Sequence, residues 1–99
     1  MVARIPIDRD RIADFCRRHH IRKLSLFGSV LRDDFGADSD VDVLVEFEPG
    51  QTPGLAFFDM EKEFASLVGR DVDLVTETEL SRWIREEVLA NMETVYAAP

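Results

Sequence analysis

The stretch GSVLRDDFGADSDVDVLV, residues 28–45, joins a glycine–serine turn to the most regular strand pattern in the chain. From residue 40 to residue 47 the side chains alternate, with the valines at 41, 43 and 45 on one face and Asp40 and Asp42 on the other. Because successive side chains of a strand point to opposite faces, both carboxylates leave the same face of the predicted sheet. The valine face is predicted to be buried.

Helical and strand patterns alternate on both sides of this stretch, which predicts an α/β domain spanning residues 1–99. Asp8 is a candidate N-cap for the first helix, and Gly69 is a natural stop for the second. The expected elements are a helix from Asp8 to about residue 20, strand 23–27, a helical turn over 29–34, strand 40–47, helix 55–68, strand 71–76 and one long helix over 77–96.

Five residues in these elements carry a chemical pattern. Gly28 lets a phosphate approach the backbone closely and permits a positive φ, and the Ser29 hydroxyl can donate to phosphate oxygens. Asp40 and Asp42 are hard oxygen ligands that repel each other unless a cation lies between them, and such ligands favour Mg²⁺. If strand 71–76 pairs beside strand 40–47, Asp73 reaches the same cluster. Three carboxylates holding two Mg²⁺ ions suit in-line phosphoryl transfer.

Three segments carry a family resemblance: GSVLR at residues 28–32, SDVDVLV at residues 39–45, and the later LVGRDVDLV at residues 67–75. Together they resemble the minimal nucleotidyltransferases of the DNA polymerase beta superfamily, over roughly residues 22–96. The resemblance implies a mixed β-sheet flanked by helices. It also implies that Asp40 and Asp42 bind both metals, that Asp73 aligns or deprotonates the acceptor, and that Gly28 and Ser29 hold the triphosphate. Arg32 matches an arginine that is frequent in the motif and is expected to contact phosphate.

The same resemblance implies a biological setting. Chains this short resemble the antitoxin half of toxin–antitoxin pairs whose toxin is an all-helical HEPN ribonuclease. In that arrangement the nucleotidyltransferase moves AMP from ATP onto a tyrosine of the toxin. The expected donor is therefore ATP, and the expected partner is a HEPN-type toxin.

Charge and composition exclude several other classes of function. The net charge is −8, although residues 1–32 carry eight basic and three acidic side chains. This basic segment is either the solvated face of a helix or a surface that steers triphosphate or meets an acidic partner. The acidic remainder argues against strong binding to nucleic acid. No stretch approaches the ~20 apolar residues of a membrane span, and Cys16 stands alone, so we expect a cytoplasmic protein without a membrane.

The predicted long helix is apolar over more than half of its circumference, with Leu80, Ile84 and Val88 on its central stripe. Such a helix is either buried on two sides or partly covered by a partner, and the small domain favours a partner. The candidate anchors for that partner are Trp83, Leu89 and Tyr96. The opposing interpretation is that one or more of them packs in the core.

Two further functions remain compatible with these residues. The first is nucleotide transfer to a small molecule, although such enzymes usually carry an additional helical substrate domain. The second is a binding module that blocks a partner by occupancy and has lost its catalysis. The presence of Asp40, Asp42 and Asp73 argues against the second, because decay usually removes a metal ligand first.

Overall fold

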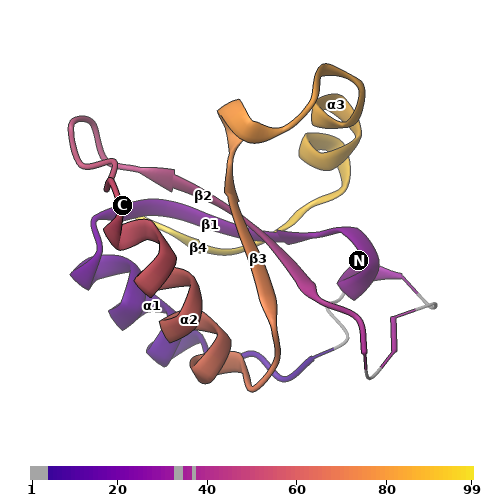
Figure 1. Ribbon diagram of the computed structural model, residues 1–99, viewed down its shortest axis with the longest axis horizontal. Helices are drawn as coiled ribbons and strands as arrows, with labels where there is room; N and C mark the ends of the chain where they lie inside the picture. Colours follow the sequence, from indigo (N-terminus) through magenta and orange to yellow (C-terminus); the bar gives the residue numbers. More distant parts are fainter. Residues whose placement is uncertain (1–4, 33–34, 37) are drawn as a thin grey trace.

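The protein is built on a four-stranded mixed sheet with helices on both faces. The structure is a computed structural model, and it describes residues 5–32, 35–36 and 38–99. The strand order is β3-β2-β1-β4, with β1 antiparallel to both β2 and β4, and with β2 parallel to β3. Figure 1 shows α1 and α2 on one side of this sheet and α3 on the other. The elements are α1 (Arg9–Arg18), β1 (Ile21–Phe27), the 3₁₀ turn η1 (Gly28–Leu31), β2 (Val41–Phe47), α2 (Ala56–Val68), β3 (Val72–Thr76), the 3₁₀ turn η2 (Glu77–Glu79), α3 (Arg82–Asn91) and β4 (Glu93–Ala97).

The start of α1 and the end of α2 lie where the sequence predicts. Asp8 caps α1, its side chain accepting a hydrogen bond of 3.1 Å from the Arg11 amide. Gly69 ends α2 with a φ of 75°, a left-handed conformation in which only glycine avoids a steric penalty. Among the helices described, none has the length and apolar character that a membrane crossing requires.

Strand β2 separates two apolar clusters. On one face Val41, Val43 and Val45 are buried beneath α1 and α2, as their alternation predicts. On the other face Leu44 packs with Val88 of α3 in a smaller cluster. The face that carries Asp42 is therefore only partly covered, because α3 packs over the part at Leu44.

The crossover from β2 through α2 to β3 makes these two strands parallel neighbours. Such a connection needs a helix between the strands, and α2 provides it. Strand β3 lies at the edge of the sheet, where Glu61 of α2 accepts a hydrogen bond of 2.9 Å from the Leu74 amide. This hydrogen bond ties β3 to α2 at the residue that follows Asp73.

The prediction of one long helix over residues 77–96 is wrong. The segment divides into η2, α3 and β4, and the backbone is extended at Leu80 and Met92. Thr76 and Glu79 form a reciprocal cap at the start of η2. The extended backbone of Leu80 and Ser81 then separates this turn from α3. At the other end β4 pairs with β1, and the hydroxyls of Ser25 and Thr94 lie 3.1 Å apart across that pair.

This correction changes the set of candidate anchors. Tyr96 lies on β4 rather than on a helix, and it is half-buried against the main core. Trp83 and Leu89 remain on α3, where their exposed fractions are 88% and 39%. The core interpretation is therefore right for Tyr96 and wrong for Trp83.

Candidate active site

The turn after β1 places Gly28 directly against a carboxylate of the next strand. Gly28 has a φ of 75°, and a Cβ built on it would lie against Oδ2 of Asp42, 3.2 Å from Cγ. Val30 and Leu31 of the same turn are buried, which anchors η1 to the core. A glycine is thus required here for two reasons, its backbone conformation and the space that Asp42 occupies.

Pairing of β2 with β3 brings the carboxylates of Asp42 and Asp73 together. Asp42 and Asp73 are Cα partners in the parallel register, so their side chains leave the same face of the sheet. Asp40 stands just before the first residue of β2, where the Val41 amide donates a hydrogen bond of 3.0 Å to the Asp71 carbonyl. The predicted pairing of the two aspartate-bearing strands is therefore confirmed.

The electrostatics of Asp42 reflect this crowding. Burial is the largest cause that raises the pKa of its carboxyl group, followed by the negative charges of Asp73 and Asp40. The Arg32 guanidinium acts in the opposite direction and lowers that pKa. Asp40, Asp73 and Arg32 are thus all near enough to influence Asp42. Among the side chains in the described ranges, no three His, Cys, Asp or Glu groups converge into a preassembled metal site.

The chemistry of the donor set fits a hard divalent cation. Asp40, Asp42 and Asp73 supply carboxylate oxygens. A cation between them would relieve the charge repulsion that, after burial, raises the pKa of Asp42. Mg²⁺ is commonly bound through one or two carboxylates together with substrate phosphates rather than by a complete protein cage. A cluster that is incomplete without a triphosphate is therefore consistent with that ion.

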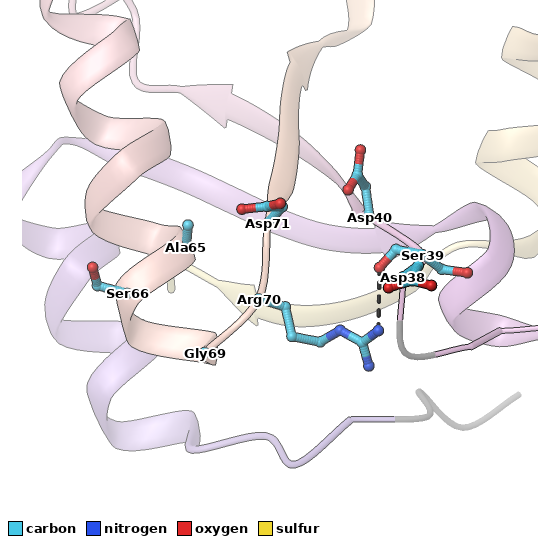
Figure 2. A pocket seen from close by; sticks show the side chains of 8 residues that line it. All are labelled: Asp38, Ser39, Asp40, Ala65, Ser66, Gly69, Arg70 and Asp71. Carbon is cyan, nitrogen blue, oxygen red and sulfur yellow. Dashed lines mark hydrogen bonds between the residues drawn. The ribbon is translucent and has the colours of Figure 1, made fainter.

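Arg70, to which the sequence analysis assigned no role, fixes the chain segment that leads to Asp40. Its guanidinium donates to the carbonyls of Gly36 and Ser39, the latter at 3.3 Å, and lies 4.2 Å from the centroid of the Phe35 ring. Figure 2 shows this side chain reaching from the start of β3 toward residues 38–40. A basic residue directly before an aspartate-bearing strand was the available signal, yet its target could be found only in the fold.

A cavity of about 590 Å³ opens beside Arg70, between the end of α2 and the segment before β2. Its walls include Asp40 and Asp71, as well as Ser66 of α2. Asp42, Asp73 and Gly28 do not line it. This cavity therefore touches the carboxylate cluster at Asp40 but does not contain the other two aspartates.

Comparisons with known proteins agree with this geometry. Residues 9–95 match the family model described as "Nucleotidyltransferase domain". The chain is 40% identical over 80 residues to the protein adenylyltransferase MntA of Thermococcus cleftensis, covering 80% of this chain and 77% of that protein.

Two solved structures share the fold at 21% identity each. One is a toxin–antitoxin complex with AMP-PNP, which has a TM-score of 0.74 and covers 93% of this chain and 75% of that one. The other is a complex of a tri-AMPylated HEPN toxin of Shewanella oneidensis with an MNT antitoxin. Its TM-score is 0.66, and the match covers 91% of this chain and 70% of that one. The match over residues 9–95, together with the identity to a named adenylyltransferase, shows that this chain belongs to the nucleotidyltransferase domain family.

Proposed function

We propose that this chain is an antitoxin that transfers AMP from ATP onto a hydroxyl group of a HEPN-type toxin. The observation that carries the proposal is the placement of the Gly28 turn against Asp42, with Asp73 as its neighbour on the adjacent strand. The 40% identity to a protein adenylyltransferase supports the choice of a protein acceptor. The structure of a tri-AMPylated HEPN toxin with its antitoxin supports the choice of partner.

The positions of the site residues support a proposed role for each of them. Ser29 follows Gly28 in η1 and would donate its hydroxyl hydrogen to a phosphate oxygen, while the charge of Arg32 acts on the Asp42 carboxylate. Asp40, Asp42 and Asp73 hold the divalent ions, for which we propose two Mg²⁺. These ions, when bound, polarise the phosphate oxygens and offset the charge that develops on pyrophosphate.

The proposed reaction is a single displacement at the α-phosphorus of ATP. The acceptor oxygen, expected to be that of a tyrosine, forms a bond to this phosphorus. The bond from the α-phosphorus to the bridging oxygen breaks, and pyrophosphate leaves. Asp73 accepts the proton of the attacking hydroxyl, because it lies beside Asp42 on an exposed edge strand that a protein acceptor can approach.

The decisive test is to mix the purified chain with ATP, Mg²⁺ and the protein encoded by its genomic neighbour, and then to measure the intact mass of both proteins. We expect the partner to gain one or more AMP groups, and we expect the Asp40→Asn, Asp42→Asn double variant to leave its mass unchanged. A partner that is bound and silenced without any mass change would contradict the transferase and favour action by occupancy. Modification of an added aminoglycoside instead would favour a small-molecule acceptor.

A further inference from the structure

Asp40 lies one residue before β2, so its backbone is positioned by the residues on either side of it. On the C-terminal side the Val41 amide donates a hydrogen bond of 3.0 Å to the Asp71 carbonyl. On the N-terminal side the Ser39 carbonyl accepts a hydrogen bond of 3.3 Å from the Arg70 guanidinium, which is drawn as a dashed line in Figure 2. Two consecutive residues, Arg70 and Asp71, therefore hold the two neighbours of Asp40.

The Arg70 guanidinium also binds residues that come before Ser39. It donates to the Gly36 carbonyl, and its central carbon lies 4.2 Å from the centroid of the Phe35 ring, which packs against the main core. Gly36 and Ser39 are bonded to each other as well. The Ser39 amide donates to the Gly36 carbonyl at 3.1 Å, and the Gly36 amide donates to the Ser39 Oγ at 3.1 Å. Arg70 therefore ties these three residues into one unit that ends directly before Asp40.

The backbone of Arg70 gives this side chain a fixed starting point. Gly69 ends α2, and the Arg70 amide still donates to the Ala65 carbonyl of that helix at 3.2 Å. Two residues after Arg70 β3 begins, and this strand carries Asp73. Arg70 thus lies between a helix end and the strand of the third carboxylate, so its contacts join the Asp40 segment to the Asp73 segment.

Charge provides a second explanation for an arginine at this position. Asp38, Asp40 and Asp71 line one cavity together with Arg70, so a cation there offsets their mutual repulsion. The two explanations predict different effects of a lysine. A guanidinium is a planar fork that can donate to two carbonyls while it stacks on a ring, whereas an ammonium is a compact point charge. Lysine would therefore keep the charge and lose the fork.

We propose that Arg70 is a positioning residue for the metal site, acting on Asp40 through the Ser39 carbonyl. Mg²⁺ demands near-ideal octahedral geometry, so its affinity falls when a carboxylate ligand is not held in place beforehand. Arg70 holds the Asp40 backbone before any ligand arrives, and it does so without touching the metal or the nucleotide. This inference rests on the proposed function, because it takes Asp40 as one of the ligands of Mg²⁺.

The first measurement needs no metal. Amide hydrogen exchange is followed by NMR in EDTA for the unaltered chain, for Arg70→Lys and for Arg70→Gln, with Arg85→Gln at an exposed position of α3 as the matched control. The Val41 amide reports on the Asp40 segment, and the Leu44 amide reports on the middle of β2. We expect Val41 to exchange at least about tenfold faster in both Arg70 variants, the scale of one lost hydrogen bond, while exchange at Leu44 is unchanged.

The second measurement is the Kd for Mg²⁺–ATP, obtained by calorimetry. Both Arg70 variants should bind at least about tenfold more weakly, the usual scale when a residue that supports a metal ligand is lost. Arg85→Gln should bind normally. Normal binding by Arg70→Lys would show that charge suffices and would overturn the positioning role. Equal acceleration of exchange at Val41 and Leu44 would also overturn it, because the whole domain would then be destabilised.

These measurements do not depend on AMP transfer. Thermal unfolding checks that each variant folds, and if Arg70→Gln does not, Arg70→Lys decides alone because it keeps the charge and the aliphatic stem. Failure of the proposed function would look different. The binding of Mg²⁺–ATP would still depend on Arg70, while the intact mass of the protein encoded by the genomic neighbour would not change.

Discussion

The carboxylate of Asp42 lies where any side chain at position 28 would have to lie. A Cβ on Gly28 would come within 3.2 Å of Asp42 Cγ and still closer to its Oδ2, and the φ of 75° at Gly28 adds strain for any other residue. The turn and the carboxylate are therefore fitted to each other, although they belong to different elements of the fold.

We expect Gly28→Ala to abolish Mg²⁺–ATP binding as well as to lower stability. The left-handed backbone alone costs about 1 kcal/mol, and the new methyl group also displaces Asp42. Gly50→Ala is the matched control, because Gly50 has a φ of 78° with open space around it. Calorimetry should find normal nucleotide binding in Gly50→Ala and none in Gly28→Ala. Similar binding in the two variants would show that the contact with Asp42 is unimportant.

The repulsion at Asp42 should be visible as a pH dependence of stability in the absence of metal. Burial and neighbouring charges raise the pKa of its carboxyl group, so the folded chain releases this proton at a higher pH than the unfolded chain does. Stability is then lost as the pH rises from about 3.9 through the raised pKa. Asp42→Asn should therefore unfold at a higher temperature than the unaltered chain at pH 7 in EDTA. The difference should shrink towards pH 4, and a constant difference would contradict this account.

Mg²⁺ and ATP together should raise the melting temperature by several degrees. A ligand that binds only the folded state stabilises it by about 2.7 kcal/mol at a hundredfold excess over its Kd. We expect the Asp40→Asn, Asp42→Asn double variant to lose this increase. The pair Asp59→Asn, Glu86→Gln, which removes two exposed charges on α2 and α3, should keep it. An undiminished increase in the first double variant would refute the metal assignment.

Asp73 should affect the rate of transfer more than it affects nucleotide binding. If it accepts the proton of the attacking hydroxyl, Asp73→Ala loses at least about a hundredfold in rate, the usual scale for a positioned base. The Kd for Mg²⁺–ATP should change much less, because Asp40 and Asp42 remain. Single-turnover AMP transfer and calorimetry measure the two quantities separately. A fully active Asp73→Ala would move the role to another carboxylate, and Asp71 would be tested next.

The exposed side of α3 is the expected docking surface for the partner protein. Trp83 and Leu89 are the candidate anchors on α3 and both are exposed, and buried aromatic anchors of interfaces are worth about 2 kcal/mol or more each. Trp83→Ser combined with Leu89→Ser should weaken the complex and slow modification of the partner, while Mg²⁺–ATP binding stays normal. Phe58→Ser, at an exposed apolar position on α2, is the control. Normal modification by the α3 double variant would place the interface elsewhere.

Local patterns were sufficient for most of the elements. Asp8 and Gly69 fixed a beginning and an end of helices because capping depends on one residue and its immediate neighbours. The alternation from residue 41 to residue 45 identified the buried face of β2, since strand periodicity is a local property. Residues 33, 34 and 37, which belong to the predicted turn and the connection after it, lie outside the described residues.

The C-terminal segment could not be interpreted in this way. Residues 93–97 have a helical apolar spacing when they are read as a continuation of residues 80–92, yet they form β4. Their state is decided by the free edge of β1, which supplies backbone partners that lie about 70 residues earlier in the chain, as the pairing of Ser25 with Thr94 illustrates. A window of neighbouring residues contains no information about that edge.

The sequence by itself determined the chemistry of this protein: a glycine–serine turn, two aspartates on one strand and a third on another, in a spacing that belongs to nucleotidyltransferases. Only the tertiary structure decided how these groups meet. The parallel pairing of β2 with β3 places Asp73 beside Asp42, and the packing of α3 creates a cavity next to Gly28. Arg70 acquires a function only where the chain folds it against Phe35, Gly36 and Ser39. Residue types and local periodicity are encoded along the chain, whereas contacts between distant segments depend on burial and pairing that the whole domain must satisfy at once.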